Sequence, residues 1–258
     1  MAARKPSRSD LDATRVLLTQ LGLEHVSEQL PELLEHGVRQ ELTLPRFLQT
    51  VCQREQEFRE ERRVRTGLKL SGLPVGKSLE SFDFAFQRSV DKSQIDLLAT
   101  SEFVRRKEVV LLLGPPGVGK SHLAAGLGVK AVQNGCSVAF MSADHLIDLV
   151  RRDEAADKRR LHRRKYMTTG LLIIDELGFQ DLDRRDAHLL FKVISHRYER
   201  GSTIITSNKS IREWPDMLAG DEVLATAILD RLLHHCHVIQ IDGRSFRLRD
   251  MEQKLDER

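Results

Sequence analysis

The stretch LLLGPPGVGKSHLA, residues 111–124, decides the fold of this chain. It breaks an apolar run with three glycines and two prolines, and then places Lys120 and Ser121 at the start of a helix-like sequence. The spacing G-x-x-x-x-G-K-[ST] is typical of a loop whose backbone N–H groups surround phosphates, and glycines supply the unusual backbone angles that such a loop needs. We therefore predict that a nucleotide contacts Gly114, Pro115, Pro116, Gly117, Val118, Gly119, Lys120, Ser121 and His122.

The residues after the glycines define the chemistry of this loop. In such a loop the lysine reaches the β- and γ-phosphates, and the serine hydroxyl binds Mg²⁺. A helix that begins near Lys120 adds the positive end of its dipole. The alternative is a glycine-rich turn that only connects a strand with a helix. The match to the whole motif, between a strand-like and a helix-like flank, favours the nucleotide site over this alternative.

The composition is that of an ordinary globular protein. Of 258 residues, 40% are hydrophobic and 31% charged, and the net charge of +3 permits contact with nucleic acid without requiring it. The three cysteines lie far apart and form no C-x-x-C pair, which disfavours a disulfide framework or a zinc site. No apolar run approaches the roughly 18 residues of a membrane span, and the N-terminus lacks the apolar core of a signal peptide. We expect a cytoplasmic protein with no membrane partner.

Strand-like runs alternate with helix-like ones through the second part of the chain. The strand-like runs are residues 108–114, 137–142, 170–177, 201–208 and 237–241. Strands that are apolar on both faces and separated by helices indicate a parallel sheet with helices on each side. We therefore predict an α/β fold with a five-stranded parallel sheet. Residues 242–258 are too few for a helical lid of the usual size, so we expect no C-terminal lid.

The N-terminal part has apolar residues at helical spacing. We predict a small bundle of short helices between residues 11 and 69, interrupted at Gly22, Pro31, Gly37 and Pro45. A stretch rich in glycine and proline, SGLPVGKS, follows and is typical of a linker. We predict a helical domain for partner or DNA binding over residues 1–70, a linker and entry segment over 71–88, and an ATPase domain over 89–258.

The run LLIIDELGF, residues 171–179, delivers two carboxylates to the end of a buried strand. The carboxyl ends of parallel strands are where such sheets bind ligands. Asp175 is expected to hold Mg²⁺, and Glu176 to orient and deprotonate the water that attacks the γ-phosphate. A solvated Asp-Glu pair is the alternative, which the phosphate loop upstream disfavours.

Two further residues are candidates for the same site. Asn208 follows the fourth strand-like run, where its amide would hydrogen-bond the attacking water or the γ-phosphate; otherwise it is a turn or capping residue. Arg231 lies late in the helix-like stretch before the last strand. It is either buried against Asp230 or placed at a subunit edge, where it would point into a neighbour's nucleotide. Helical periodicity leaves both possibilities open.

Four segments together resemble one family. GPPGVGKSHLA, LLIIDELGF, STIITSNKSIREW and AILDRLLHHCHVIQIDGRSFRL are similar, in this order, to the IstB-like branch of the AAA+ ATPases, which are helper proteins of insertion-sequence transposition related to the DnaC-type helicase loaders. The resemblance covers almost the whole chain. It implies an AAA+ ATPase that uses ATP and Mg²⁺, forms a ring or helical homo-oligomer on double-stranded DNA, and remodels target DNA for a partner transposase.

The resemblance also implies roles for single residues. Asn208 is the first sensor, and Arg231 is the arginine finger that acts on the ATP of the next subunit. Arg247 is a candidate for the second sensor. Together with Lys120 and Glu176, the residues Asn208 and Arg231 make up the catalytic set that we predict.

The segment RRDEAADKRRLHRRKY, residues 151–166, carries eight basic and three acidic residues. It precedes the Asp-Glu strand, where the resemblance implies a helical insertion that contacts DNA. Such clustering suits the neutralisation of phosphates, although a solvated charged helix is the alternative. On a continuous helix, Arg160 and Arg164 would share one face. The DNA contacts that we predict are Lys158, Arg159, Arg160, Arg163, Arg164 and Lys165.

Three other functions remain as alternatives at this point. A helicase loader of DNA replication would share the chemistry and differ in its partner, which the N-terminal domain would select. A small-molecule P-loop kinase usually needs an arginine-bearing lid, and the expected absence of a lid argues against it. A DNA clamp that binds ATP without hydrolysis would not need Glu176.

Overall fold

The computed structural model describes residues 8–246, 248 and 249 of the chain. The described residues divide into two compact units, the first ending at Thr66 and the second beginning at Gly67. Within the part that the structure describes, none of the helices combines the length and the apolar character that crossing a membrane requires.

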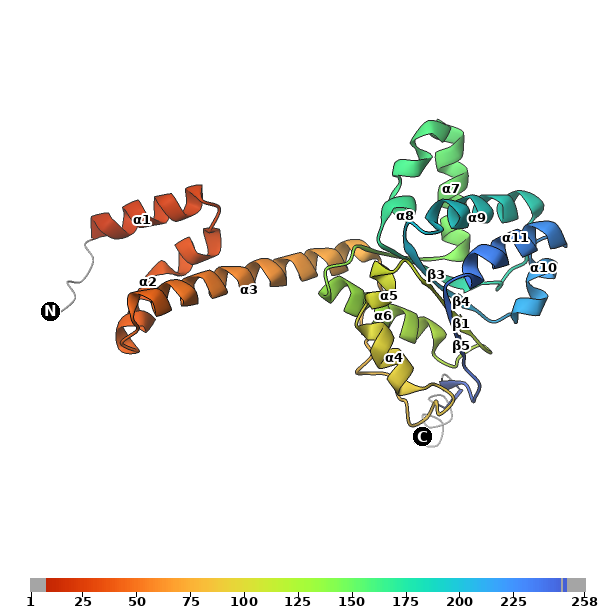
Figure 1. Ribbon diagram of the computed structural model, residues 1–258, viewed down its shortest axis with the longest axis horizontal. Coiled ribbons are helices and arrows are strands. Elements are labelled where there is room, and N and C mark those ends of the chain that lie inside the picture. Colours follow the sequence, from red (N-terminus) through yellow and green to blue (C-terminus); the bar gives the residue numbers. More distant parts are fainter. Residues whose placement is uncertain (1–7, 247, 250–258) are drawn as a thin grey trace, which may run out of the picture. The chain divides into compact units, whose positions relative to one another are not determined.

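The first unit is helical, as predicted. It contains α1 (Arg8–Gln20), α2 (Glu24–Arg39) and the larger part of α3 (Leu44–Ser71), which Figure 1 shows in red and orange. The prediction that all of its helices are short is wrong, since α3 has 28 residues. The prediction of breaks at Pro31 and Gly37 is also wrong, because both residues lie inside α2.

Packing explains why α2 continues through these two residues. Val26, Leu30 and Leu33 form a buried stripe on one side of the helix, and this burial outweighs the backbone hydrogen bond that Pro31 cannot donate. At Gly37, a Cβ atom would lie 2.8 Å from the ring of Phe47, so the glycine serves close packing between α2 and α3.

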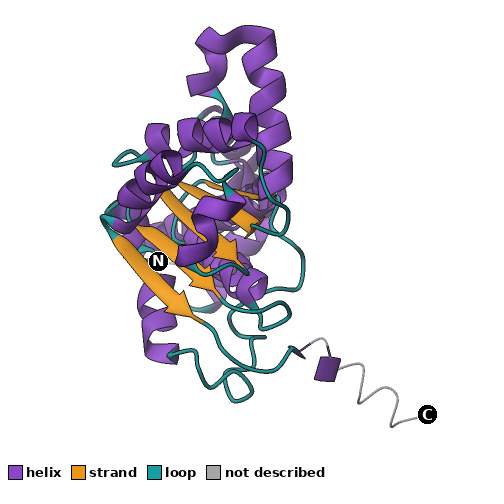
Figure 2. Ribbon diagram, turned by 90° about the vertical axis from the view of Figure 1, so that its right-hand side faces the viewer, coloured by secondary structure: helices purple, strands orange, loops and turns teal. Residues whose placement is uncertain are grey.

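The second unit contains a five-stranded sheet in which all paired strands are parallel (Figure 2), and this confirms the predicted fold. The strand order is β2-β3-β4-β1-β5. Each strand lies within two residues of the bounds that the sequence predicts. The strands are β1 (Val109–Leu113), β2 (Val138–Ser142), β3 (Leu171–Leu177), β4 (Ser202–Ser207) and β5 (Cys236–Gln240).

Helices cover both faces of this sheet (Figure 1). One face carries α6 (Lys120–Gln133) and α4 (Lys92–Ala99), with α5 (Glu102–Arg105) beside α4. The other face carries α7 (Ala143–Asp157), α9 (Arg184–Arg197) and α11 (Glu222–Leu233). Four shorter elements belong to the second face: η1 (Lys158–Arg163), α8 (Lys165–Thr168), η2 (Ile211–Glu213) and α10 (Trp214–Met217).

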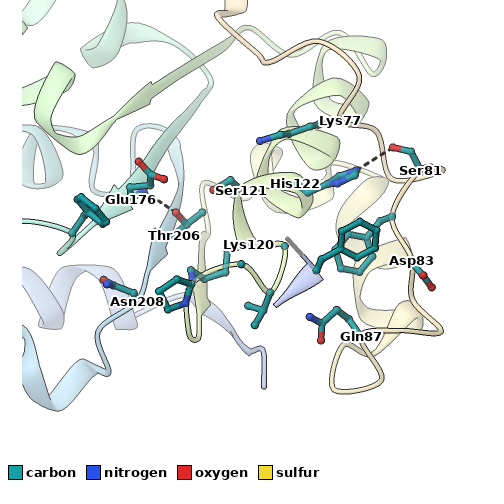
Figure 3. Close-up of a pocket in the computed structure, with 17 residues that line it drawn as sticks. Lys77, Ser81, Asp83, Gln87, Lys120, Ser121, His122, Glu176, Thr206 and Asn208 are labelled. Carbon is teal, nitrogen blue, oxygen red and sulfur yellow. Dashed lines mark hydrogen bonds between the residues drawn. The ribbon is translucent and has the colours of Figure 1, made fainter. Parts of the chain in front are cut away.

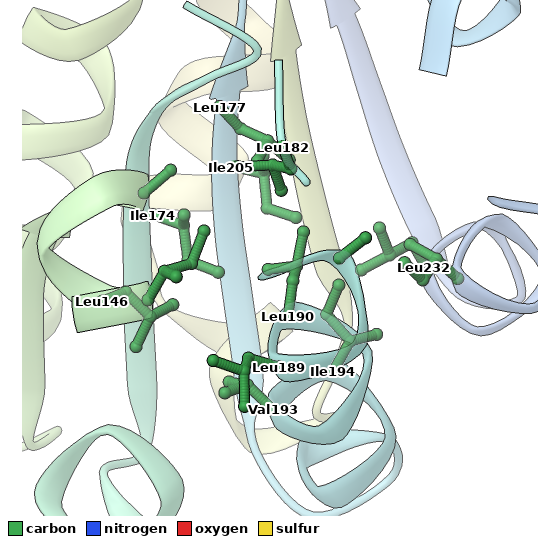
Figure 4. Close-up of a cluster of buried hydrophobic side chains, with 14 of the residues drawn as sticks. Leu146, Ile174, Leu177, Leu182, Leu189, Leu190, Val193, Ile194, Ile205 and Leu232 are labelled. Carbon is green, nitrogen blue, oxygen red and sulfur yellow. The ribbon is translucent and has the colours of Figure 1, made fainter. Parts of the chain in front are cut away.

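The main core lies between the sheet and the second of these faces. Alternate strand residues point to the same side, so Ile174 and Ile205 pack against Leu190 and Val193 of α9 (Figure 4). These side chains are almost fully buried. The core fixes the strand ends from which the polar residues of the site project.

The predicted linker and entry segment belongs to the second unit and is packed rather than free. Leu79 and Phe82 are buried, and a Cβ atom at Gly126 of α6 would lie 2.7 Å from Leu79. Residues 71–88 therefore pack within the second unit over part of their length. The domain limits at 70 and 88 remain a prediction, since the structure divides its two units between 66 and 67.

Candidate functional site

The phosphate loop lies between β1 and α6, where the sequence predicts it. Gly114 has a φ of +151°, and a Cβ atom there would lie 2.1 Å from the carbonyl oxygen of Ile241. Gly119 is the N-cap of α6 with a φ of +99°, and its Cβ atom would lie 2.6 Å from the ring of Phe82. The loop therefore needs glycine for its backbone angles and also for space.

Lys120 is held close to the backbone of its own loop. Its Nζ donates hydrogen bonds to the carbonyl oxygens of Gly114, at 2.6 Å, and Pro115, at 2.8 Å. Ser121 follows in the first turn of α6, at the positive end of the helix dipole. The ammonium group and the helix N-terminus together make this end of the loop suited to an anion.

A cavity of about 330 Å³ joins the loop to the strand ends (Figure 3). Residues 116–122 line it, and Glu176 and Asn208 line it from β3 and from the end of β4. Figure 3 shows Glu176 and Asn208 at one end, Asp83 and Gln87 at the other, and Lys120 between them. Predicted residues that lie far apart in the sequence thus face one cavity.

Asp175 is the exception among the predicted strand-end residues. It lies next to the cavity without lining it and is 8% exposed. The hydroxyl of Thr206 donates a hydrogen bond to its Oδ1 atom at 2.6 Å, which is short because the acceptor is charged. The structure thus places a neutral hydroxyl against Asp175.

Glu176 has an unusual backbone conformation for a residue other than glycine. Its φ is +62°, in the left-handed region, and β3 carries one extra residue relative to β4 between Ile174 and Leu177. This bulge directs the Glu176 side chain into the cavity while Asp175 stays buried. The Glu176 N–H donates to the hydroxyl oxygen of Thr206 at 2.9 Å.

Sequence reasoning missed Thr206 and the residues at the far end of the cavity. Thr206 stands two residues before Asn208 on β4, and this spacing on a strand was the available signal. Gln87 is buried and donates from Nε2 to the carbonyl oxygen of Arg244 at 3.0 Å. The N–H of Phe246 donates to the carbonyl oxygen of Gly117 at 3.0 Å, so the segment after β5 forms one wall of the loop.

His122 has a structural role in the same wall. Its Nε2 atom lies 2.8 Å from the carbonyl oxygen of Ser78 and 3.1 Å from the hydroxyl of Ser81, and its ring packs edge-on against Phe82. These contacts attach the segment that enters the second unit to α6, and His122 also lines the cavity.

Arg231 lies at the other end of the sheet from this cavity. Its Nη1 donates to the carbonyl oxygen of Ala227 at 2.8 Å, and its guanidinium carbon lies 5.0 Å from the ring centroid of Phe191. It lines a small second hollow with Val109 and Thr203, which stand at the starts of β1 and β4. The guanidinium is therefore outside the cavity that its own chain forms.

The basic segment does not form the continuous helix that we predicted. Helix α7 ends at Asp157, the 3₁₀ helix η1 follows, and Arg164 is extended, with φ −71° and ψ 149°. Arg160 and Arg164 thus do not share a helical face. The break places Leu161 and Tyr166 in the core, where their burial stabilises the irregular backbone.

Several basic side chains of this segment contact other groups of the same chain. Arg160 contacts Asp157 at 3.2 Å, Arg164 contacts Asp153 at 2.9 Å, and Lys165 donates to a backbone carbonyl. Arg163 is exposed. The side chains of Lys158 and Arg159, and the whole of Arg247, lie outside the part that the structure describes.

Comparison of the sequence with models of protein families shows to which family the chain belongs. Residues 16–254 match the model of the IstB-like ATP binding protein family. The chain belongs to this family. The match includes the phosphate loop, the Asp-Glu strand, Asn208 and Arg231, which are the features that resemble IstB-like proteins at the level of sequence.

Two curated relatives match this IstB-like chain over nearly their full length. The "Insertion sequence IS21 putative ATP-binding protein" of Pseudomonas aeruginosa is 44% identical over 91% of this chain and 88% of the relative. The "Insertion sequence IS5376 putative ATP-binding protein" of Geobacillus stearothermophilus is 41% identical over 92% of this chain and 94% of the relative.

Solved structures share the fold of the IstB-like chain. The crystal structure of the DnaC helicase loader is 22% identical, with a TM-score of 0.52, over 65% of this chain and 98% of that one. The crystal structure of DnaI is 19% identical, with a TM-score of 0.54, over 67% of this chain and 96% of that one. These likenesses place the second unit in the P-loop AAA+ fold.

Proposed function

We propose that this chain is a Mg²⁺-dependent ATPase that assembles on double-stranded DNA and serves a partner transposase. The observation that carries the ATPase part is the single cavity that joins the phosphate loop to Glu176 and Asn208. A triphosphate in the loop would present its γ-phosphate to these two side chains.

The site residues that the sequence predicts have chemical tasks in this proposal. Lys120 exchanges its two backbone acceptors for β- and γ-phosphate oxygens. Glu176 orients and deprotonates the attacking water, and Asn208 hydrogen-bonds that water or the γ-phosphate. Pro115, Pro116 and Val118 contribute the shape of the loop and its backbone groups.

The oxygen ligands near the loop fit Mg²⁺. This ion prefers oxygen ligands, and nucleotide sites bind it through one or two protein groups together with phosphates. Ser121 and Asp175 would hold it, and it would neutralise charge on the β- and γ-phosphates. In the described residues no group of three or more His, Cys, Asp or Glu side chains could hold a metal ion by itself.

Arg231 completes the site of a neighbouring subunit in this proposal. Its place at the starts of β1 and β4 separates it from the cavity of its own chain, which argues against action within one subunit. An arginine finger stabilises the charge of the transition state and contributes about 10³-fold or more. A ring or helical homo-oligomer would bring the two ends of the sheet together.

The relatives and the charge of residues 151–166 support the DNA part. Both relatives cited above are named as ATP-binding proteins of insertion sequences. The exposed bases Arg160 and Arg163 would bind DNA phosphates, with Lys158, Arg159, Arg164 and Lys165 as further contacts. The helical first unit, which lies outside the ATPase fold, would recognise the transposase.

Phosphate release at saturating ATP and Mg²⁺ tests the ATPase proposal. Wild-type protein should hydrolyse ATP, Lys120→Ala should lose ATP binding, and Glu176→Gln should bind ATP and turn over at least about 10²-fold more slowly, since it lacks the general base. Binding is measured separately with a fluorescent ATP analogue. Hydrolysis by Glu176→Gln at the wild-type rate would show that Glu176 is not the base.

A further inference from the structure

Thr206 connects both carboxylates of the site through one hydroxyl group. Its Oγ1 atom donates to Oδ1 of Asp175 at 2.6 Å and accepts from the backbone N–H of Glu176 at 2.9 Å. The side chain is fully buried on β4, yet it lines the cavity between β3 and the loop. Figure 3 shows Thr206 next to Glu176, with a dashed line for the hydrogen bond between these two residues.

The two hydrogen bonds fix different parts of the site: the orientation of the Asp175 carboxylate and the backbone conformation of Glu176. The bond to Asp175 occupies one carboxylate oxygen and thereby sets the orientation of the other. The bond from Glu176 holds the backbone of a residue whose φ of +62° is costly for a side chain with a Cβ atom. Without the hydroxyl, the backbone N–H of Glu176 would lose its acceptor. The hydrogen bond would then no longer stabilise the left-handed backbone conformation of this residue.

The β-bulge makes the hydroxyl necessary at this position. Ile174 pairs with Ile205 and Leu177 pairs with Ser207, so the regular ladder is interrupted opposite Thr206. The N–H of Glu176 therefore uses a side-chain acceptor, because the bulge removes it from the regular ladder. A valine would fill the same volume and leave the N–H and the Asp175 carboxylate unsatisfied.

We propose that Thr206 is a positioning residue that sets the geometry of Glu176 and Asp175 for ATP hydrolysis. The inference rests on the proposed ATPase function of the cavity. Thr206 supplies no proton to the reaction; it fixes the base on the water side and the carboxylate on the metal side. The two carboxylates consequently act as one unit whose geometry depends on a single hydroxyl.

Two substitutions separate the hydroxyl from the shape of the side chain. Thr206→Val keeps the branched shape and removes both hydrogen bonds, whereas Thr206→Ser keeps the hydroxyl and loses a methyl group. Thr203→Val is the matched control, because Thr203 is a buried threonine at the other end of the same strand, where its hydroxyl accepts from Arg197 at 3.2 Å. All three variants are compared with wild type and Glu176→Gln.

The measurements are kcat and KM for ATP, the Mg²⁺ concentration that gives half-maximal rate, analogue affinity, and the thermal unfolding midpoint. Thr206→Val should bind the analogue within about threefold of wild type, lower kcat by about 10²-fold, and require more Mg²⁺, since misplacement of a reacting group by about 1 Å has an effect of this size. Thr206→Ser should restore most of kcat. Thr203→Val should unfold at a lower temperature and keep its kcat.

The outcomes separate this inference from the function on which it rests. If wild type turns over, Glu176→Gln does not, and Thr206→Val matches wild type in kcat and Mg²⁺ requirement, the inference is wrong and the ATPase proposal stands. If Thr206→Val and Thr203→Val lose kcat equally, Thr206 has only a structural role, which also overturns the inference. If wild type itself does not hydrolyse ATP, the proposed function fails.

Discussion

At the scale of single residues, the site depends on backbone positions that most side chains avoid. Glu176 and Gly119 both have a left-handed backbone conformation, but Glu176 bears a carboxylate and Gly119 bears no side chain. The difference follows from their neighbours. Glu176 has a hydrogen-bond acceptor in Thr206, while Gly119 faces the ring of Phe82 at a distance that excludes a Cβ atom.

Gly119→Ala should separate the cost of backbone strain from the loss of the nucleotide site. A left-handed alanine costs about 1–2 kcal/mol of unfolding free energy. Gly220→Ala is the matched control, because Gly220 is also left-handed, with φ +68°, but a Cβ atom there would meet no other atom within 4 Å. Both variants should lose stability in denaturant titrations, and Gly119→Ala should lose more, because its Cβ atom also meets the ring of Phe82.

Only Gly119→Ala should lose ATP affinity, by at least about tenfold or about 1.4 kcal/mol, because the loop must move away from Phe82. Binding is measured with a fluorescent ATP analogue. Equal affinity in Gly119→Ala and Gly220→Ala would contradict the steric account of the loop.

The residues that the sequence predicts at this scale are those with a local pattern. Lys120 and Ser121 follow from the motif, and Glu176 follows from an apolar run that ends in carboxylates. The role of Gln87 could not be predicted, because it depends on a contact with the segment after β5. For Thr206, the spacing to Asn208 indicated a shared side of the strand, but not the hydrogen bond to Asp175 on the neighbouring strand. Hydrogen bonds between distant parts of the chain leave no periodic signal in the sequence.

At the scale of elements, buried strands were predictable and the basic segment was not. A strand that is apolar on both faces has a composition that few other structures share. Five of the seven residues 158–164 are Lys or Arg, so their sequence suits an exposed helix equally well. Buried anchors at Leu161 and Tyr166, and the acceptors that carbonyls of residues 166, 167, 169 and 170 offer to Arg197, decide the backbone instead.

Arg197 shows how such anchoring works within the second unit. It is 2% exposed and donates only to backbone carbonyls and the Thr203 hydroxyl. Burial without a carboxylate partner lowers its pKa to about 10. The guanidinium still remains protonated at neutral pH, and it ties the residues before β3 to the start of β4.

Salt-dependent DNA binding tests the basic segment. The double variant Arg160→Ala/Arg163→Ala removes two exposed bases, and each lost phosphate contact should lower the slope of log affinity against log salt by about 0.9, giving a total of about two units. Arg105→Ala/Arg106→Ala is the matched control, because both side chains are 65% exposed and pair with Glu102 on α5. Duplex binding is measured with ATP at several salt concentrations.

The control pair should leave the slope unchanged, and both double variants should bind ATP as wild type does. A slope equal to that of wild type in Arg160→Ala/Arg163→Ala would mean that residues 151–166 form a solvated surface. The DNA contacts would then have to lie elsewhere on the chain.

At the scale of the whole molecule, the residues to which we assign ATP hydrolysis lie at two ends of one sheet. Glu176 and Asn208 stand at the carboxyl ends of the strands, and Arg231 stands near their amino ends. In the function that we propose, one subunit holds the general base, and its arginine finger lies where a second subunit can approach. Sequence alone left the place of Arg231 open between Asp230 and a subunit edge, because helical periodicity does not show which face of a helix meets another chain.

We propose that each active site combines Glu176 of one subunit with Arg231 of the next. The most direct test mixes Arg231→Ala protein with Glu176→Gln protein on duplex DNA and measures phosphate release, with assembly verified for each mixture. Neither variant should hydrolyse ATP alone, and an equal mixture should recover activity in about one interface in four, where an intact Glu176 meets an intact Arg231. Full activity of Arg231→Ala alone, or no recovery at any mixing ratio in verified assemblies, would contradict the account.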